Sequence, residues 1–396
     1  MRTLLAAVVL GTSSLAVAAS GGEGPYLPGG EEMKKAVDAR KDKTELSKLA
    51  ASMKPGTWAE LKTEVPARLW TSPPPSRGLH IAGWTDDAHW DSRTGQFFYM
   101  GLRQTRQFIA YSEEKNAWRV VELDKKSDNP CFQSKFGHIY SSNGFDHERS
   151  RFYHRYNGFK DEKEGLDLAG GISFFDALTE KWTKLPPMPA NSGFGGQAIE
   201  YFGAMDGLVA LGKQTWIFSN ERQKWESLGA SPVDGYHSLI RHNPYRQEVL
   251  IAGGNQQPNT VARIKKDGKI EKLRDFPGKL SVRSDKFAVD PQTGRYLIFD
   301  FGEFGPGKDL VVYEFDSDEN EYRVVEAAAA QYPYKGYARP FTVCAFIPEY
   351  NVIMFANGSV FLYKHDPSVK YPPAPAASPA PGGKDDGKAG KEDEKE

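Results

Sequence analysis

The 396-residue sequence predicts an all-β protein, a six-bladed β-propeller built of four-stranded blades. Two observations predict this class. Aromatic residues make up 12% of the chain and are interspersed with 39 Gly and 26 Pro, a composition typical of short strands cut by frequent turns. An aromatic residue followed three positions later by Leu or Val also recurs, at steps of 64, 43, 45 and 52 residues from Trp118 onward if one aliphatic variant is counted. Repeats of about 40–50 residues are typical of propeller blades.

The repeated strand is the outermost one that we expect in each blade. The copies of the pattern, each given by its aromatic residue and the Leu or Val that follows, are Trp58 and Leu61, Trp118 and Val121, Trp182 and Leu185, Trp225 and Leu228, and Tyr322 and Val325. Ile270 and Leu273 form the aliphatic variant. A second strand precedes five of these copies across a short polar turn, at residues 108–112, 172–176, 215–219, 261–265 and 310–316. Two inner strands lie further upstream, joined by Asp- or Asn-led turns of type I chemistry such as residues 290–294.

The two ends of the repeat predict how the ring closes. Residues 360–366 resemble a third strand that no aromatic strand follows, whereas residues 58–61 form an aromatic strand that no third strand precedes. Pairing the two would cover both open edges, which a ring of strands has to do to avoid edge-to-edge association. We therefore expect the N-terminal strand to complete the last blade, which gives six blades.

The propeller is expected to span residues 56–370, with a signal peptide over residues 1–19. Met1 and Arg2 are followed by an apolar stretch and then by Ala16-Val17-Ala18, the small residues that a signal peptidase accepts. The alternative is a membrane anchor, but the stretch is shorter than the ~20 apolar residues that a span needs. We expect export to the bacterial periplasm or the cell exterior, with no transmembrane segment left after cleavage.

Residues 20–55 are expected to form a linker and an amphipathic helix or a broken helix pair. Apolar side chains recur there at roughly helical spacing, at Met33, Val37, Leu46, Leu49 and Met53. Packing on the propeller is the expected role, and docking of a partner is the alternative. Residues 371–396 are Pro/Ala-rich and then charged, so we expect a disordered tail.

Charge and cysteine content narrow the class of protein. With 51 basic and 52 acidic residues the formal charge is −1, which gives no reason to expect nucleic acid as a partner. Two cysteines, Cys131 and Cys344, exclude a disulfide framework or a multi-Cys zinc site and leave one bridge open. The 8 histidines show no metal-ligand spacing, so no metal or cofactor is predicted. A monomer is expected.

The order of turn, glycine-ended strand and aromatic strand resembles the kelch repeat over about residues 56–366. Gly253-Gly254 matches its double glycine, and Phe175-Asp176 with the following Trp182 strand matches its downstream half. The resemblance implies a plan like the propeller domain of galactose oxidase. Blade four alone keeps both glycines, and blade six has Asn357-Gly358 instead. No Tyr/Cys/His set maps onto the copper site of galactose oxidase, so copper chemistry is not carried over.

In a kelch-type propeller, the connections between blades and the loops from second to third strands share one face, and this implies the candidate site. The ligand-binding candidates from the connections are Trp84, Asp86, Asp87, His138, Tyr236, His237, Arg283 and Arg339, with His89 and Asp285 beside them. The second-to-third loops add Arg103, Arg106, residues 158–168, Gln256, Gln257 and residues 303–308.

Such a polar, aromatic mouth predicts a binding module for carbohydrate or protein. The alternative is a sugar-modifying enzyme, such as a sialic-acid-type epimerase or mutarotase, in which Asp86 and Asp87 would work as acid and base. The structural interpretation is that one Asp binds backbone amides, while His89, His138 and His237 join neighbouring strands or blades. A buried carboxylate or imidazole with a perturbed pKa at the channel mouth would favour the enzyme.

Overall fold

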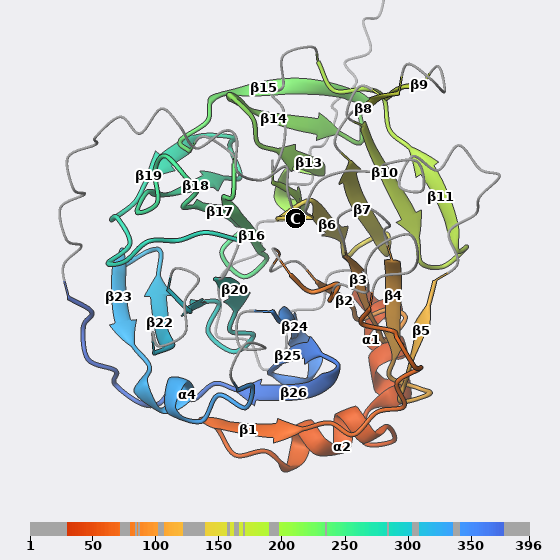
Figure 1. Cartoon of the computed structure of the whole chain (residues 1–396), viewed down its shortest axis with the longest axis vertical. Helices are drawn as coiled ribbons and strands as arrows, with labels where there is room; N and C mark the ends of the chain where they lie inside the picture. The colour runs from red at the N-terminus through yellow and green to blue at the C-terminus, as the bar shows by residue number, and fades with distance from the viewer. Residues whose placement is uncertain are drawn as a thin grey trace, which may run out of the picture.

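A computed structural model describes residues 30–375, except for 72–79, 84, 86–87, 102–106, 122–138, 157–158, 162–165, 169–170, 190–197, 234–235, 283–284, 303–308 and 336–340. Six four-stranded antiparallel sheets form a closed ring around a central axis (Figure 1). The predicted six-bladed propeller is therefore confirmed. Within the described ranges, no helix is long and apolar enough to cross a membrane.

In blades one to five the strands run from the axis outward in chain order. Blade one holds β2 (His89–Asp91), β3 (Gln96–Gly101), β4 (Gln107–Ser112) and β5 (Ala117–Val120). Blade two holds β6 (Asn143–Asp146), β7 (Arg151–Tyr156), β10 (Gly171–Asp176) and β11 (Lys181–Lys184), with a separate hairpin of β8 (Phe159–Asp161) and β9 (Leu166–Leu168). Blade three holds β12 (Ile199–Phe202), β13 (Gly207–Ala210), β14 (Gln214–Ser219) and β15 (Lys224–Ala230).

The second half of the ring repeats this order. Blade four holds β16 (Leu239–Asn243), β17 (Glu248–Ala252), β18 (Val261–Lys265) and β19 (Ile270–Lys272). Blade five holds β20 (Lys286–Val289), β21 (Tyr296–Asp300), β22 (Val311–Asp316) and β23 (Glu321–Val324). Blade six holds β24 (Val343–Ile347), β25 (Val352–Asn357), β26 (Ser359–Lys364) and, from the N-terminal side of the chain, β1 (Thr57–Glu60).

The turn between the two inner strands is built from the same parts in four blades. An Asp or Asn side chain accepts a hydrogen bond from a backbone N–H two or three residues later, which holds the turn closed. The residues that accept are Asp91, Asp146, Asn243 and Asp290. Blades three and six use a 3-10 turn instead, η1 (Gly203–Met205) and η3 (Pro348–Tyr350), which ends in left-handed Asp206 or Asn351. Blades three and six therefore lack the turn, closed by an Asp or Asn side chain, of the other four blades.

The outer aromatic residue of a blade is hydrogen-bonded to the preceding blade. In four blades its side chain donates to an oxygen just after the preceding outer strand, over 3.1–3.2 Å. The donor and acceptor pairs are Trp58 with Ala328, Trp118 with Thr63, Trp225 with Pro186 and Tyr322 with Arg274. The aromatic repeat in the sequence is therefore a repeated joint between blades.

The ring is closed as predicted, by antiparallel pairing of β1 with β26 that places Trp58 opposite Tyr363. The Trp58 ring packs against Tyr363 and Phe355 of blade six and Phe299 of blade five. Leu61, which follows β1, is buried and donates its N–H to Val360. The N-terminal strand thus supplies both backbone pairing and core to the last blade.

The N-terminal extension is a broken helix pair, α1 (Gly30–Arg40) and α2 (Glu45–Ser52). The pair lies at the seam, which is the place where blades six and one meet (Figure 1). Arg40 inserts into this seam. Its Nε lies 2.8 Å from Glu113 of blade one, and its Nη2 lies 3.6 Å from Glu349 of blade six. Both carboxylates are fully buried, and burial raises the pKa of Glu349 to about 6. Glu113 also accepts from Tyr350 and Thr44.

Part of the predicted disordered tail lies on the propeller, so its boundary at residue 371 was wrong. Val324 donates to the carbonyl of Pro372 over 2.9 Å, and Ala374 donates to Tyr322 over 2.8 Å. The segment follows the outer edge of β23 in antiparallel direction. It covers strand edge that would otherwise be open.

Deleting residues 56–64 should lower the free energy of unfolding far more than deleting residues 376–396. The first deletion exposes the edge of β26 and removes Trp58, whose loss alone is worth about 3–5 kcal/mol. Urea denaturation of both truncated proteins measures the difference. Equal midpoints would contradict the role of β1 in closing the ring.

Arg40→Met should lower the free energy of unfolding by about 3–5 kcal/mol, because it leaves two buried carboxylates without their guanidinium. Arg119→Met is the matched control, since Arg119 forms a solvent-exposed pair with Glu180 that is worth about 0–1 kcal/mol. Urea denaturation compares the two variants. Equal losses would show that Arg40 does not hold the seam.

Candidate functional site

Two of the eight predicted ligand-binding residues, Tyr236 and His237, lie in the described part of the chain. The other six lie outside it: Trp84, Asp86, Asp87, His138, Arg283 and Arg339. Arg103, Arg106 and residues 303–308 also lie outside, whereas His89, Asp285, Gln256 and Gln257 are described. The site can therefore be built from the inner strands and the connection that enters blade four.

Tyr236 and His237 form an aromatic cluster with Tyr140 at the entry to blade four. The Tyr236 and His237 rings lie 4.0 Å apart, and the Tyr140 ring lies 4.7 Å from that of His237. The hydroxyls of Tyr140 and Tyr236 are 3.1 Å apart. His237 is buried and its Nδ1 lies 2.7 Å from Asn255 Oδ1, whereas Tyr236 is half-buried.

The contact between His237 and Asn255 joins a blade entry to a second-to-third loop, so the two kinds of connection share one face at blade four. Gly253 and Gly254 allow this close approach. Both have positive φ, a Cβ on Gly254 would lie only 3.0 Å from the carbonyl oxygen of Tyr236, and a Cβ on Gly253 would clash with the carbonyl of Leu280. We call this side of the ring the loop face and the side with the inner-strand turns the turn face.

Hydrogen bonds cross the axis just below the loop face. Lys286 of blade five is fully buried, and its Nζ donates over 2.8 Å to the carbonyl of Thr85, which precedes blade one. Thr85 Oγ1 in turn donates over 2.6 Å to the carbonyl of Tyr140. Ser141 Oγ donates over 3.1 Å to Ser238, which links the entries of blades two and four. The Lys286 and Ser141 bonds join blades that are not neighbours in the ring, whereas the Thr85 bond joins the neighbouring blades one and two.

Asp285, beside Lys286, is a buried carboxylate at the same level. Burial and the nearby carboxylate of Asp300 raise the pKa of Asp285 well above its ordinary value. Its two oxygens accept hydrogen bonds from the backbone N–H groups of Ser281, at 2.7 Å, and Phe301, at 3.1 Å. The geometry is that of a carboxylate that holds two loop backbones together.

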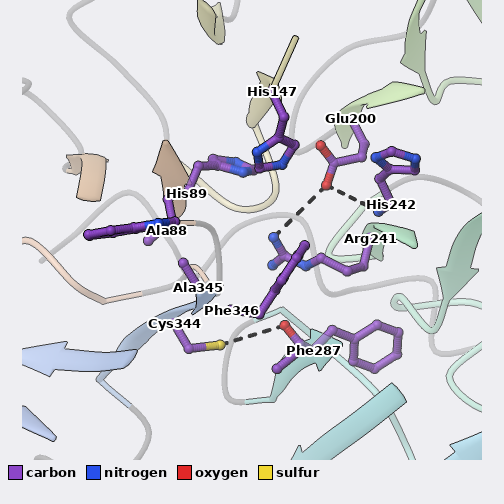
Figure 2. Close-up of a pocket in the computed structure, with 12 residues that line it drawn as sticks. Ala88, His89, His147, Glu200, Arg241, His242, Phe287, Cys344, Ala345 and Phe346 are labelled. Carbon is purple, nitrogen blue, oxygen red and sulfur yellow. Dashed lines mark hydrogen bonds and ion pairs between the residues drawn. The ribbon is translucent and has the colours of Figure 1, made fainter. Parts of the chain in front are cut away.

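A cavity lies on the axis below this level, with walls from all six blades (Figure 2). Its volume of about 10 Å³ is enough for roughly one water molecule. The lining residues are Ala88, His89, Trp90, His147, Glu200, Arg241, His242, Phe287, Ala288, Cys344, Ala345 and Phe346. We call it the axial cavity.

One ion pair lies in the wall of the axial cavity (Figure 2). Arg241 Nη1 is 3.9 Å from Glu200 Oε2, and both side chains are buried. The Glu200 carboxylate also accepts from the backbone N–H groups of Tyr201, at 3.0 Å, and His242, at 3.3 Å. Glu200 of blade three therefore contacts both the backbone of blade four, at His242, and the guanidinium of Arg241.

Three imidazoles from blades one, two and four complete the polar wall. The His89 ring stacks on Phe145 of blade two, and the His147 ring lies 6.1 Å from that of Phe346 of blade six. Burial lowers the pKa of His242 to about 3. Burial and the neighbouring His242, His89 and Arg241 lower the pKa of His147 well below its ordinary value.

Sequence reasoning named His89 but missed His147, Glu200, Arg241 and His242. One signal could have found part of this set. His89 and Arg241 each stand two positions before the Asp or Asn that starts the inner turn, and Glu200 stands at the equivalent place in blade three. Aligning the inner turns would have placed these three side chains at one level of the axis.

One of the two cysteines and part of the possible metal ligands lie in the described part of the chain. Cys344 is a buried residue of β24 whose Sγ lies 3.6 Å from the carbonyl oxygen of Phe287, whereas Cys131 lies outside the described ranges. Among the side chains that the structure describes, no group of three or more His, Cys, Asp or Glu is placed to hold a metal ion.

No protein-family model and no curated protein matches the chain. Among solved structures it is similar to a structural genomics protein of unknown function from Bacteroides thetaiotaomicron, with 12% identity, a TM-score of 0.48, and coverage of 78% of this chain and 75% of that one. It is also similar to TolB from Acinetobacter baumannii, with 10% identity, a TM-score of 0.41, and coverage of 60% and 52%. Similarities this distant assign no function.

Proposed function

We propose that the chain is an exported, kelch-like binding module that holds a protein or carbohydrate ligand on its loop face. The observation that supports this proposal is that the axis of the ring is closed. Lys286 and Thr85 bridge the axis below the loop face, and the axial cavity has room for about one water molecule. A sugar or a peptide is far larger, so its binding surface has to be a face of the ring.

The loop face is favoured over the turn face by the aromatic cluster. Tyr236 is half-buried, and its ring is braced by His237 and Tyr140, so the surface it presents is already ordered. An ordered Tyr ring binds the apolar face of a sugar or a peptide side chain at little entropic cost. The turns of the opposite face are short and closed by their own side chains.

Tyr236→Ala should weaken ligand binding by about fivefold or more, the range of an interface hot spot, with little change in the thermal midpoint. Tyr245→Ala is the matched control, because Tyr245 is a half-buried Tyr of the same blade on the turn face. A glycan array and a pull-down with the purified protein identify the ligand, and titration then compares the variants. Equal losses in both variants would remove the loop face from consideration.

A sugar-modifying enzyme is the second candidate, because Asp285 is a buried carboxylate with a raised pKa near the channel mouth. Its two backbone hydrogen bonds favour a structural role instead. Asp285→Asn should therefore lower the thermal midpoint without abolishing any sugar anomerisation, measured by NMR on sialic acid. Catalysis by the unchanged protein that disappears in a stably folded Asp285→Asn variant would favour the enzyme.

A further inference from the structure

We propose that the outer edge of blade five is a docking site for an extended, proline-rich segment of a partner protein. Residues 371–375 occupy this edge in the structure, and the partner displaces them (Figure 1). We call the edge of β23, together with His365, the rim site. It lies on the outside of the ring, so it is separate from the proposed ligand surface on the loop face.

Residues 371–374 contact the ring through side chains three positions apart. Tyr371 and Ala374 are buried, whereas Pro372 and Pro373 between them are exposed. Side chains with this spacing lie on one side of a polyproline II helix, the extended conformation that proline favours. The segment thus binds as proline-rich peptides bind to recognition domains that carry aromatic surfaces.

The rim site offers a fixed platform to the tyrosine. The ring of Tyr371 stacks on that of His365, with ring centres 5.5 Å apart and planes at 26°. His365 Nε2 donates over 2.8 Å to Glu314, and its Nδ1 lies 3.3 Å from the Tyr363 hydroxyl. Glu314 is itself paired with Arg295, at 3.2 Å. Because the propeller holds both nitrogens of His365, the platform does not depend on the segment that covers it.

The alanine of the segment stands where the edge needs a donor. Pro372, Pro373 and Pro375 have no backbone N–H. Ala374 has one and donates it over 2.8 Å to the carbonyl of Tyr322. Its small side chain belongs to the core cluster that contains Tyr322. The rim site therefore favours a small residue with an N–H three positions after an aromatic one.

Two backbone hydrogen bonds join the described part of the segment to β23. The second runs over 2.9 Å from the N–H of Val324 to the carbonyl of Pro372. Pro373 lies between the two bonds, opposite Arg323, so its backbone faces away from β23. The strand β1, by contrast, pairs with four residues of β26. A segment held by so few bonds can leave without unfolding the blade.

A short connection explains why the chain's own segment fills the site. Residues 367–370 link it to Asp366, whose carbonyl accepts a hydrogen bond from the Tyr371 hydroxyl over 2.9 Å. A short linker gives an effective concentration on the order of 1 mM. A partner has to compete with the segment, which makes residues 371–375 an autoinhibitory element of the rim site.

The test measures binding of a labelled synthetic peptide of residues 369–379 by fluorescence anisotropy. The proteins are the full chain and a full-chain variant with Tyr371→Ala and Ala374→Pro, which releases the segment. The released variant should bind the peptide at least about tenfold more tightly than the unchanged chain, because no segment competes in cis. No binding by the released variant, or equal binding by both proteins, overturns the proposal.

Altered peptides show whether the site reads this spacing. A peptide with Ala374→Pro should not bind the released variant, because it lacks the N–H that donates to Tyr322. The matched control is Pro373→Ala, which should bind as before, since the backbone of Pro373 faces away from β23 and its side chain is exposed. Equal losses overturn the proposal. A dimer of the unchanged chain that the peptide dissociates, seen by size-exclusion chromatography, would assign the site to a second copy and also overturn it.

Amide exchange in the unchanged protein tests release of the segment without any variant. The N–H of Val324 donates to the segment, whereas that of Val325 donates over 2.8 Å to Val312 inside blade five. Val324 should exchange at least about tenfold faster than Val325, because release exposes its N–H while the sheet stays intact. Equal rates would make the segment a permanent strand of the blade and overturn the proposal.

Discussion

The pairing of β1 with β26 is the interaction on which the rest of the structure depends. Five blades come from continuous stretches of chain, but the sixth is complete only when a strand from the other end of the propeller joins it. Until then, blades six and one have no fixed relation, because about 220 residues separate them in the chain. Closure makes the six inner strands meet at one axis, so every property of that axis is a consequence of it.

Three kinds of polar contact join the blades of the closed ring, each in a different place. At the outside, aromatic side chains donate to the blade before them, as Trp225 does to Pro186. Where blades one and six meet, Arg40 binds a carboxylate of each. At the centre, Lys286 and Thr85 join blades five and one across the axis. The apolar contacts supply most of the stabilisation, while these polar contacts fix how the blades are oriented.

The sequence predicts the outer part of this protein well and the inner part poorly, for a physical reason. An outer strand has to cover the preceding blade, so an aromatic residue such as Trp118 or Trp182 returns at the same place and the repeat can be counted. The residues that line the axis share no such packing requirement from blade to blade. Glu200 and Arg241 meet through two different blades, and His147 reaches them from a third. Each is an ordinary strand or turn residue until closure brings the three together.

The two faces of the ring differ because different kinds of connection form them. On the turn face, the inner turns are short and closed by Asp or Asn side chains, so little surface is left to vary. On the loop face, the connections are longer and meet around Tyr236 and Asn255. A change in an exposed loop side chain therefore acts mainly on the surface, whereas a change at Glu200 or Arg241 acts on several blades at once. This separation lets a ligand surface diverge on a ring whose centre is fixed.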